Sequence, residues 1–434
     1  MITISAEWLK EQWPVLNASG LAPVSLSKWD DGDAYTLVSL GPMSGTNVVR
    51  GVVVMESTSA PEVQVVIRLR RVPGGRPDQT VDLFNLSDGT CYRVEGQIKE
   101  RDVARVVQVQ VVGVKETLEK RRKSLIESHL LQEVSVLVIG LGTGGAQTAV
   151  ELAKSGVGNF ILVDSDRLDI GNVTRHNAGI SHAGRRKVYV ARDLLLEKNP
   201  SVVVRTFPIS ADWNSYELIC QMVREANLVL CATDSRKSKL FINHICVKER
   251  KTAIYGGAFT RAYGGQVLRV RPGRSPCYQC FVMGMPEQEA DYEISSEAQA
   301  QEIAYADHPV AVEPGLSIDV APISIMMAKL ALQELIDGKE STLHVLDKDF
   351  TAPWYLWLNR PEPKTAYASL PPLSESSDEM TILRWYGVEL EREKSCHVCG
   401  DFGRAARETY GFEAGELPVL QEGPLPAGVK LEEE

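Results

Sequence analysis

The chain has 434 residues, of which 44% are hydrophobic and 24% are charged, and its formal net charge is −10. This length accommodates about two or three domains with a substantial core. Scattered Lys and Arg in an acidic chain argue against a nucleic-acid partner. No run of about 18 apolar residues occurs, and the N-terminus lacks the basic and apolar regions of a targeting segment. We therefore expect a soluble, cytoplasmic protein that neither binds nucleic acid nor enters a membrane.

Residues 1–115 predict a small, mostly β accessory domain. A helical pattern at Ala6–Val15 precedes short segments of strand character, and Pro73–Gly75 and Ser87–Gly89 are turn signals between them. This region carries no catalytic motif, so a docking surface and a role in stabilising a dimer both remain open. The expected strands are 35–40, 48–55, 63–69, 81–86, 91–98 and 104–114.

From about Leu118 onward, strand patterns alternate with helical patterns. Such alternation makes a mostly parallel sheet covered by helices on both faces. We therefore expect an α/β, Rossmann-like domain at 116–400, with an antiparallel extension at Gly264–Val270 and a tail at 401–434 rich in Pro, Gly and Glu. The expected strands are 134–139, 160–163, 202–207, 228–231 and 253–255, and the expected helices are 146–154, 187–197, 216–225, 237–249 and 323–336.

The most informative segment runs from Ser135 to Gly145 and has the sequence SVLVIGLGTGG. Glycines between a strand and a helix let backbone N–H groups approach a phosphate, and the helix N-terminus favours negative charge. Asp164 ends the next expected strand, where a carboxylate can accept from ribose hydroxyls. The segment predicts a nucleotide site, although a tight turn without ligand and a nicotinamide-binding loop remain open. The glycines concerned are Gly140, Gly142, Gly144 and Gly145.

Downstream residues favour a site for ribose, phosphate and a metal ion over a nicotinamide-binding loop. The segment 164–177, DSDRLDIGNVTRHN, is dense in side chains that hold ribose, phosphate and metal, whereas a dehydrogenase needs only the first acid. Lys187 opens a helical pattern, and Asp234 follows the strand at 228–231. Each residue also has a simpler interpretation: Asp166 or Asp234 as a helix cap, and Arg175 or Lys187 as solvated surface.

Four of the eight cysteines have the spacing of a metal site. Cys277 and Cys280 form one C-x-x-C pair, Cys396 and Cys399 form another, and each pair can present two thiolates to a tetrahedral ion. One shared zinc ion is the expected result. Two separate redox pairs or disulfides are the alternatives, and a reducing cytoplasm disfavours them. The remaining cysteines, Cys91, Cys220, Cys231 and Cys246, are expected in the core.

This combination of motifs resembles the ThiF/MoeB and ubiquitin-activating family, whose members adenylate the C-terminal carboxylate of a ubiquitin-like protein or peptide. The resemblance covers about Thr117–Cys399 and suggests a bacterial ubiquitin-activating-like enzyme. It implies ATP, Mg²⁺ and structural Zn²⁺ as cofactors. By motif, it implies that Gly140, Gly142 and Gly145 line the nucleotide, Asp164 binds ribose, Asp166, Asn172 and Arg175 surround the phosphates, Lys187 neutralises their charge and Asp234 holds magnesium.

The resemblance also implies a homodimer, because an arginine near the start of the domain reaches the partner subunit's site. Arg121 and Arg122 are the two candidates. The polar segment at about 285–313 resembles the family's crossover loop, which passes over the substrate's C-terminal tail. Lys239 stands where many relatives place an arginine near the phosphates, and it keeps the charge without the bidentate fork.

One feature departs from the ubiquitin-activating pattern: no cysteine lies between Cys280 and Cys396. We therefore expect no thioester on the crossover loop, and an acyl-adenylate that is passed to a conjugating protein. Ser295, Ser296 and Ser317 are poor acceptors without a nearby base. The expected function is ATP-dependent activation of a ubiquitin-like protein. A catalytically silent scaffold or partner subunit is the main alternative, and a nicotinamide-dependent oxidoreductase is a further one.

Overall fold

The computed structural model describes the strands of the first 112 residues, then residues 129–284, 315–371 and 379–400, together with single residues between these segments. The chain divides into two compact units. The first contains Met1–Ser210 and Ala331–Lys348, and the second contains Ala211–Leu330 and Asp349–Glu434. The expected crossover loop at 285–313, the tail at 401–434 and most of the Ala6–Val15 helix lie outside the described residues.

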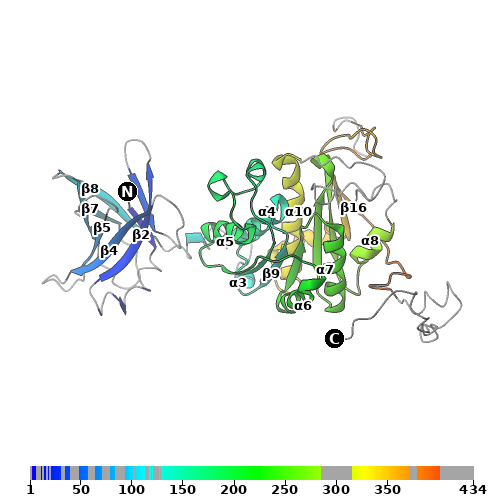
Figure 1. Cartoon of the computed structure of the whole chain (residues 1–434), viewed down its shortest axis with the longest axis horizontal. Coiled ribbons are helices and arrows are strands. Elements are labelled where there is room, and N and C mark those ends of the chain that lie inside the picture. Colours follow the sequence, from blue (N-terminus) through cyan, green and yellow to red (C-terminus); the bar gives the residue numbers. More distant parts are fainter. Residues whose placement is uncertain are drawn as a thin grey trace, which may run out of the picture. The chain divides into compact units, whose positions relative to one another are not determined.

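The N-terminal part of the first unit contains a mostly antiparallel sheet (Figure 1). Its strand order is β6-β5-β4-β2-β3-β1-β8-β7. Strand β1 runs parallel to both neighbours, and β6 and β7, at the two ends of this order, lie in contact, so the sheet is curled. Its strands are β1 (Ile2–Ser5), β2 (Leu21–Asp30), β3 (Tyr35–Ser39), β4 (Val48–Glu56), β5 (Gln64–Arg70), β6 (Gln79–Leu83), β7 (Arg93–Glu100) and β8 (Val103–Val112).

The mostly β character predicted for this region is therefore confirmed, and β3 to β8 lie within a few residues of the expected strands. Strands β1 and β2 were not anticipated. The domain boundaries at 115 and 400 stay a prediction.

The rest of the first unit has α/β architecture. Strands β9, β10 and β11 are parallel and lie in the order β11-β10-β9. Helix α4 packs on β9, α5 packs on β10 and β11, and the two helices pack on each other. The elements are α3 (His129–Gln132), β9 (Ser135–Ile139), α4 (Thr143–Ser155), β10 (Asn159–Val163), the 3₁₀ helices η1 (Ile170–Thr174) and η2 (Ile180–His182), α5 (Lys187–Lys198), β11 (Val203–Phe207) and η6 (Thr342–Lys348).

Apolar residues explain this packing. Strands β9 and β10 each bury four consecutive residues, as expected for strands covered on both faces. Helix α4 meets the sheet through small residues, including Ala146, Ala149 and Ala153, which are fully buried and let the helix approach closely. The helix ends at Gly156, whose φ of 111° is the left-handed conformation that closes a helix.

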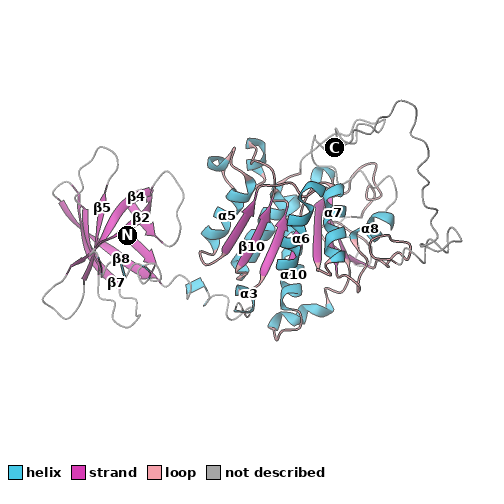
Figure 2. Cartoon of the chain, turned by 60° about the horizontal axis from the view of Figure 1, so that its bottom comes forward, coloured by secondary structure: helices cyan, strands magenta, loops and turns pink. Residues whose placement is uncertain are grey.

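The second unit continues the α/β pattern and then changes to antiparallel pairing. Strands β12 and β13 are parallel, and β14, β15 and β16 follow in antiparallel order. Helix α7 packs on β12 and β13 and against α6 and α8; Figure 2 shows the strands and helices of the chain in separate colours. The elements are η3 (Trp213–Ser215), α6 (Tyr216–Glu225), β12 (Leu228–Cys231), α7 (Arg236–Lys248), β13 (Ala253–Ala258), η4 (Thr260–Ala262), β14 (Gly264–Val270), α8 (Tyr278–Gly284), β15 (Trp354–Leu358) and β16 (Trp385–Val388); α10 (Ser317–Ile336) begins in this unit.

The predicted mixed α/β fold with a mostly parallel, Rossmann-like sheet is thus confirmed. The antiparallel extension at Gly264–Val270 is confirmed as β14, all seven residues of which are buried. Cys220, Cys231 and Cys246 lie in the core as expected, and Cys91 lies outside the described residues. Among the described residues, no helix is both long and apolar enough to cross a membrane.

We predict that Gly158→Ala destabilises the first unit. A Cβ at Gly158 would lie 1.8 Å from the carbonyl oxygen of Gln132, and the backbone of Gly158 is fixed by hydrogen bonds to Leu131 and Val203. The backbone must therefore shift, and the free energy of unfolding should fall by about 1–3 kcal/mol. Urea denaturation measures this change. Gly179→Ala is the matched control, because nothing lies within 4 Å of its added Cβ; equal stability of the two variants would contradict the prediction.

Candidate active site and metal centre

The glycine-rich turn joins β9 to α4, and no side chain caps the N-terminus of α4. Gly140 adopts a φ of 87°, which favours glycine, and Gly142 is the N-cap of α4. The N-cap provides no side-chain hydrogen bond, and a Cβ at Gly142 would meet nothing within 4 Å. Space therefore remains beside Gly142 at the N-terminus of α4, whereas Gly145 in the first turn is buried. Such an end is suited to an anion, because the first N–H groups of a helix have no partner within it and the dipole is positive there.

Asp164, at the end of β10, is hydrogen-bonded to this turn. Its Oδ2 accepts from the Leu141 N–H at 2.7 Å, and its Oδ1 accepts from the Asp166 N–H at 2.7 Å. Burial raises the pKa of the Asp164 carboxyl, while the Lys187 ammonium and the two backbone donors oppose that shift. Each carboxylate oxygen keeps a second lone pair, so both can still accept from ligand hydroxyls.

Lys187 is held beside these acids. Its Nζ lies 2.9 Å from Asp166 Oδ2, and its backbone N–H donates to the Asp166 carbonyl at 2.9 Å. Arg186 donates a side-chain hydrogen bond to the Ser165 carbonyl, which draws the same two segments together. The lysine side chain is only 13% exposed, whereas that of Asp166 is 63% exposed. The Lys187 ammonium is therefore fixed close to the Asp166 carboxylate, and because that carboxylate is exposed, solvent screens the attraction between the two charges.

Asn172 and Arg175 lie on and just after η1. Asp169 caps this helix by accepting from the Gly171 N–H at 2.7 Å, and Arg175 Nη2 donates to Asn172 Oδ1 at 3.2 Å. The first unit thus brings together predicted site residues from three segments: the glycine turn, the 164–175 segment and the start of α5. Their roles toward a nucleotide remain a prediction.

His176 was not anticipated from the sequence, and it is the buried link between η1 and the glycine turn. Its Nδ1 accepts from the Ala178 N–H at 3.1 Å, so the proton of the neutral ring lies on Nε2, which donates to the Leu141 carbonyl at 3.1 Å. The side chain is 7% exposed, and burial lowers the pKa of the imidazole. Only its position beside Arg175 hinted at this role.

We predict a pH-dependent stability that disappears in His176→Gln. In the unfolded chain the imidazole takes up a proton as the pH falls through about 6.5, whereas the folded protein resists protonation because the pKa is lowered. The contribution of His176 is therefore complete above about pH 6.5 and is lost as the pH falls toward the lowered folded value. A glutamine amide preserves both the donor and the acceptor without titrating. Thermal unfolding from pH 8 to 5 should show a smaller loss of melting temperature in the variant; parallel curves would contradict the assignment.

Asp234 lies in the second unit, just after β12 and immediately before Ser235, the N-cap of α7. Its side chain is exposed. Arg121 and Arg122 lie outside the described residues, so their predicted reach into a partner subunit stays a prediction. Lys239, expected near the phosphates, is 1% exposed, and its ammonium lies 5.9 Å from the centre of the Tyr278 ring.

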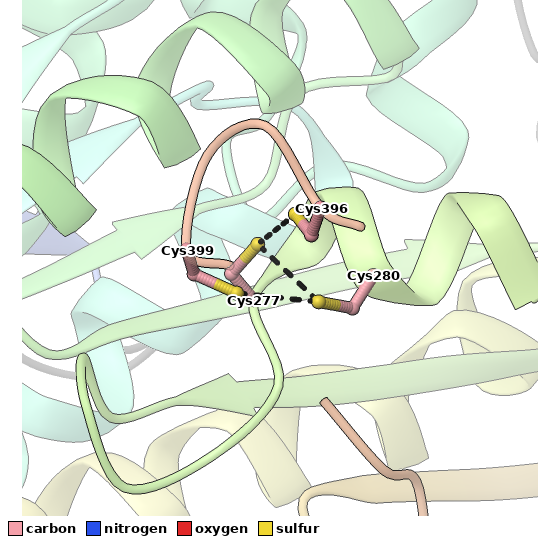
Figure 3. A group of neighbouring side chains, drawn as sticks. All are labelled: Cys277, Cys280, Cys396 and Cys399. Atoms are coloured by element: carbon pink, nitrogen blue, oxygen red, sulfur yellow. Dashed lines mark hydrogen bonds between the residues drawn. The ribbon is translucent and has the colours of Figure 1, made fainter. Parts of the chain in front are cut away.

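The four cysteines of the two C-x-x-C pairs meet at one point in the second unit (Figure 3). Cys277 and Cys280 come from the start of α8, and Cys396 and Cys399 come from the turn after β16. All four sulfur atoms lie within 4.8 Å of one another. The closest distances are 3.7 Å from Cys277 to Cys396, 3.9 Å from Cys277 to Cys280 and 3.3 Å from Cys280 to Cys399. The alternative of two separate redox pairs does not fit this single cluster.

The cluster fits a tetrahedral zinc ion. With zinc–sulfur bonds of ~2.3 Å, tetrahedral geometry places the sulfurs ~3.8 Å apart, close to the observed distances. Three of the residues are buried, so ionised thiolates need a cation beside them. The hydrogen bond with Cys280 and burial raise the pKa of Cys277, and the same hydrogen bond lowers the pKa of Cys280 to about 4. Such thiols would serve as a closed structural site without an open position for catalysis.

We predict about one equivalent of zinc per chain, with folding coupled to its binding. Cys277→Ser and Cys399→Ser should each lose the metal and lower the melting temperature. Elemental analysis and thermal unfolding measure both effects. Cys220→Ser is the control, because Cys220 is buried on α6 and is not one of the four clustered cysteines; it should retain the zinc. Freshly purified, unchelated protein without metal would refute the zinc assignment.

A glycine turn and an acid after the second strand in the first unit, with a four-cysteine cluster in the second unit, are together typical of one class of nucleotide-binding proteins. A family model described as the ThiF family matches residues 109–351, more than half of the sequence. The chain belongs to the ThiF family, as the motifs predicted.

Individual relatives are more distant. Ubiquitin-like modifier-activating enzyme 5 of Caenorhabditis elegans is 29% identical over 163 residues, which cover 36% of this chain and 39% of the relative. The probable molybdopterin-synthase adenylyltransferase of Porphyra purpurea is 31% identical over 152 residues, which cover 35% of this chain and 38% of the relative. The alignments thus span less than half the length of these curated relatives. The crystal structure of E. coli MccB with MccA-N7isoASN covers 63% of this chain and 69% of its own, with a TM-score of 0.46 and 19% identity.

Proposed function

We propose that this protein uses ATP to adenylate the C-terminal carboxylate of a ubiquitin-like protein. Two relatives carry the names of a ubiquitin-like modifier-activating enzyme and an adenylyltransferase, which supports this reaction class. The observation that carries the proposal is the hydrogen-bonded group of Leu141, Asp164, Asp166 and Lys187, which joins the turn and the lysine that would bind phosphate to the acid that would bind ribose.

In this reaction a carboxylate oxygen attacks the α-phosphorus of ATP. The bond from the α-phosphorus to the bridging oxygen breaks, and diphosphate leaves without any net proton transfer. Because both reactants are anionic, the protein must offset charge and fix geometry. The open N-terminus of α4 would bind phosphate oxygens, and Asp164 would accept from the ribose hydroxyls. Asn172 and Arg175, joined at 3.2 Å, would bind further phosphate oxygens.

Lys187 supplies the fixed positive charge. Its ammonium has three donors, so it can keep its contact with Asp166 and still donate to a phosphate oxygen. Because the contact with Asp166 already restricts the Lys187 side chain, this side chain loses less conformational entropy when a phosphate binds. The lysine would stabilise the negative charge that develops on the departing diphosphate.

Asp234 would hold magnesium together with the phosphates of ATP. An exposed carboxylate at the end of a buried strand fits this ion, which takes one or two protein carboxylates and completes its shell with phosphate and water. When bound, magnesium would neutralise charge on the triphosphate.

The proposal extends to the protein's partners. The activated carboxylate would pass to a separate conjugating protein, because no cysteine lies between Cys280 and Cys396 to carry a thioester. Arg121 or Arg122 would complete the ATP site of a partner subunit in a homodimer. The reducing cytoplasm is the compartment in which a site of four thiolates persists.

We predict that Lys187→Ala and Asp234→Asn each lower carboxylate-dependent exchange of pyrophosphate into ATP on the order of a hundredfold or more, since each removes fixed charge stabilisation. Both side chains lie outside the apolar core, so circular dichroism should remain that of the wild type. Lys154→Ala on α4 and Glu217→Gln on α6 are charge-matched surface controls and should exchange normally.

This exchange assay also tests the function itself. A silent scaffold would show no exchange in the wild type, and a nicotinamide oxidoreductase would exchange nothing and would bind NAD. Near-normal exchange in either purified site variant would overturn the assigned roles.

We predict that catalysis is shared across a dimer. An Arg121→Ala/Arg122→Ala chain and an Asp234→Asn chain are each expected to be impaired. When subunits exchange, each hybrid dimer has one site with an intact Asp234 and an arginine donated by the other chain, so mixing should restore part of the activity. Light scattering and exchange assays on the mixture measure this. A monomer, or no recovery despite proven subunit exchange, would contradict the shared site.

A further inference from the structure

Three consecutive basic residues lead into α5, and their side chains have different acceptors. Lys187 and Arg186 both donate to the segment that follows β10. Arg185 instead donates from Nη2 to Oδ2 of Asp193, at 2.6 Å, and Asp193 lies on α5 itself. The chain that enters α5 is therefore attached on one side to the preceding segment and on the other to the body of the helix.

Asp193 is a buried carboxylate with two arginine partners. The residue is 8% exposed, its Oδ2 accepts from Arg185, and its Oδ1 accepts from Arg192 Nε at 3.0 Å and Nη2 at 2.8 Å. Burial raises the pKa of this carboxyl, but the hydrogen bonds from the two arginines outweigh burial, and the pKa is lowered. Both oxygens of an ionised carboxylate are thus engaged, as a buried charge requires.

Arg185 is fixed through its backbone as well as its side chain. Its carbonyl accepts from the Leu168 N–H at 2.8 Å, and the Leu168 carbonyl accepts from the Gly184 N–H at 2.8 Å. Leu168 is 1% exposed, so this pairing rests on a buried residue. The other guanidinium nitrogen, Nη1, lies 2.8 Å from Nδ1 of His182 in η2. Arg185 therefore joins α5, η2 and the segment after β10.

The backbone pairing continues from Arg185 to Lys187, the first residue of α5. An antiparallel bridge joins Arg186 to Arg167, and the Lys187 N–H donates to the Asp166 carbonyl at 2.9 Å. The lysine thus stands at the end of a short two-stranded contact whose other end is fastened by Arg185. What restrains the backbone at Arg185 also restrains the base of the Lys187 side chain.

We propose that Asp193 is a positioning residue of the candidate nucleotide site, which fixes Arg185 and thereby places the Lys187 ammonium toward the phosphates of ATP. The inference rests on the proposed function for the identity of the nucleotide. Asp193 does not touch the nucleotide. It restrains the backbone beneath a long, flexible side chain, and an immobile base limits the positions that the ammonium can adopt.

Arg192 offers a comparison within the same group of charges. It bonds the same carboxylate, and its guanidinium lies 5.4 Å from the centre of the Tyr189 ring. Both contacts lie within α5, whereas Arg185 precedes the helix and belongs to the paired segment. If Asp193 only stabilised α5, loss of either arginine would have similar effects. If it positions Lys187, only the loss of Arg185 alters phosphate binding.

Nucleotide binding to the full-length protein, with magnesium present, tests the proposal. Asp193→Asn and Arg185→Gln each remove the ion pair, and affinity for ATP, measured by isothermal titration calorimetry, should fall about 10-fold or more. Affinity for AMP, which lacks the β- and γ-phosphates, should stay that of the wild type. The Arg185 side chain is 36% exposed, so its replacement leaves the apolar core intact.

Two further variants sharpen the comparison. Arg185→Lys keeps the charge and can still donate to Asp193, so it should recover part of the lost ATP affinity. The double variant Asp193→Asn/Arg185→Gln should bind ATP no more weakly than the weaker single variant, because the two residues act as a pair. Arg192→Gln is the matched control, which should lower the melting temperature without changing the ratio of ATP to AMP affinity.

Equal losses of ATP and AMP affinity would overturn the proposal, and so would a lower melting temperature with unchanged ATP affinity, because the pair would then support only the fold. A loss in Arg192→Gln as large as that in Arg185→Gln would also contradict it. A wild-type protein that binds no ATP would refute the nucleotide site and this inference together. ATP binding without pyrophosphate exchange would refute the proposed function alone, and the phosphate-dependent losses would still support the role of Asp193.

Discussion

The backbone N–H and the carbonyl of Leu141 are both held by hydrogen bonds, and the candidate site depends on this restraint. Asp164 accepts from its N–H, and His176 donates to its carbonyl. A hydrogen bond to a carboxylate such as Asp164 contributes about 1.5–3 kcal/mol, and one from a neutral imidazole such as His176 contributes about 0.5–1.5 kcal/mol, which together are substantial beside the backbone entropy of one glycine-rich turn. A turn made of glycines would otherwise adopt many conformations. Because Asp164 and His176 lie in the same segment, both hydrogen bonds join that one segment to the turn.

The metal centre provides the corresponding restraint in the second unit. Two cysteines precede and enter α8, and two follow β16, so one bound ion would close a loop of more than a hundred residues that includes α10 and β15. Chain closure of this length removes conformational freedom mainly from the unfolded state. Aromatic packing adds to it within the same unit, where Tyr278 lies 4.9 Å from Tyr255 and Phe281 lies 5.2 Å from Trp354, measured between ring centres.

Local sequence pattern was sufficient for much of this structure. The period of apolar residues located β9, β10 and α5 closely, because buried parallel strands and their helices are apolar over short, continuous stretches. The cysteine pairs were recognisable because their ligand spacing is short. Strand β1 was missed because its pairing with β8 lies more than a hundred residues away. His176 was missed for a similar reason: it bonds to a group 35 residues away, and nothing in a neighbouring motif marks such a partner.

The order in which the ribosome releases the chain matters for the metal centre. Cys277 emerges 119 residues before Cys396. At about 5–20 residues per second, the first pair waits roughly 6–24 seconds before the second pair exists. During that interval a half-site of two thiols is open to oxidants and to soft metals such as copper(I), which such ligands also bind. Correct loading of the four-cysteine cluster with zinc would therefore depend on how soon the second pair is synthesised, relative to oxidation or copper(I) binding at the first pair.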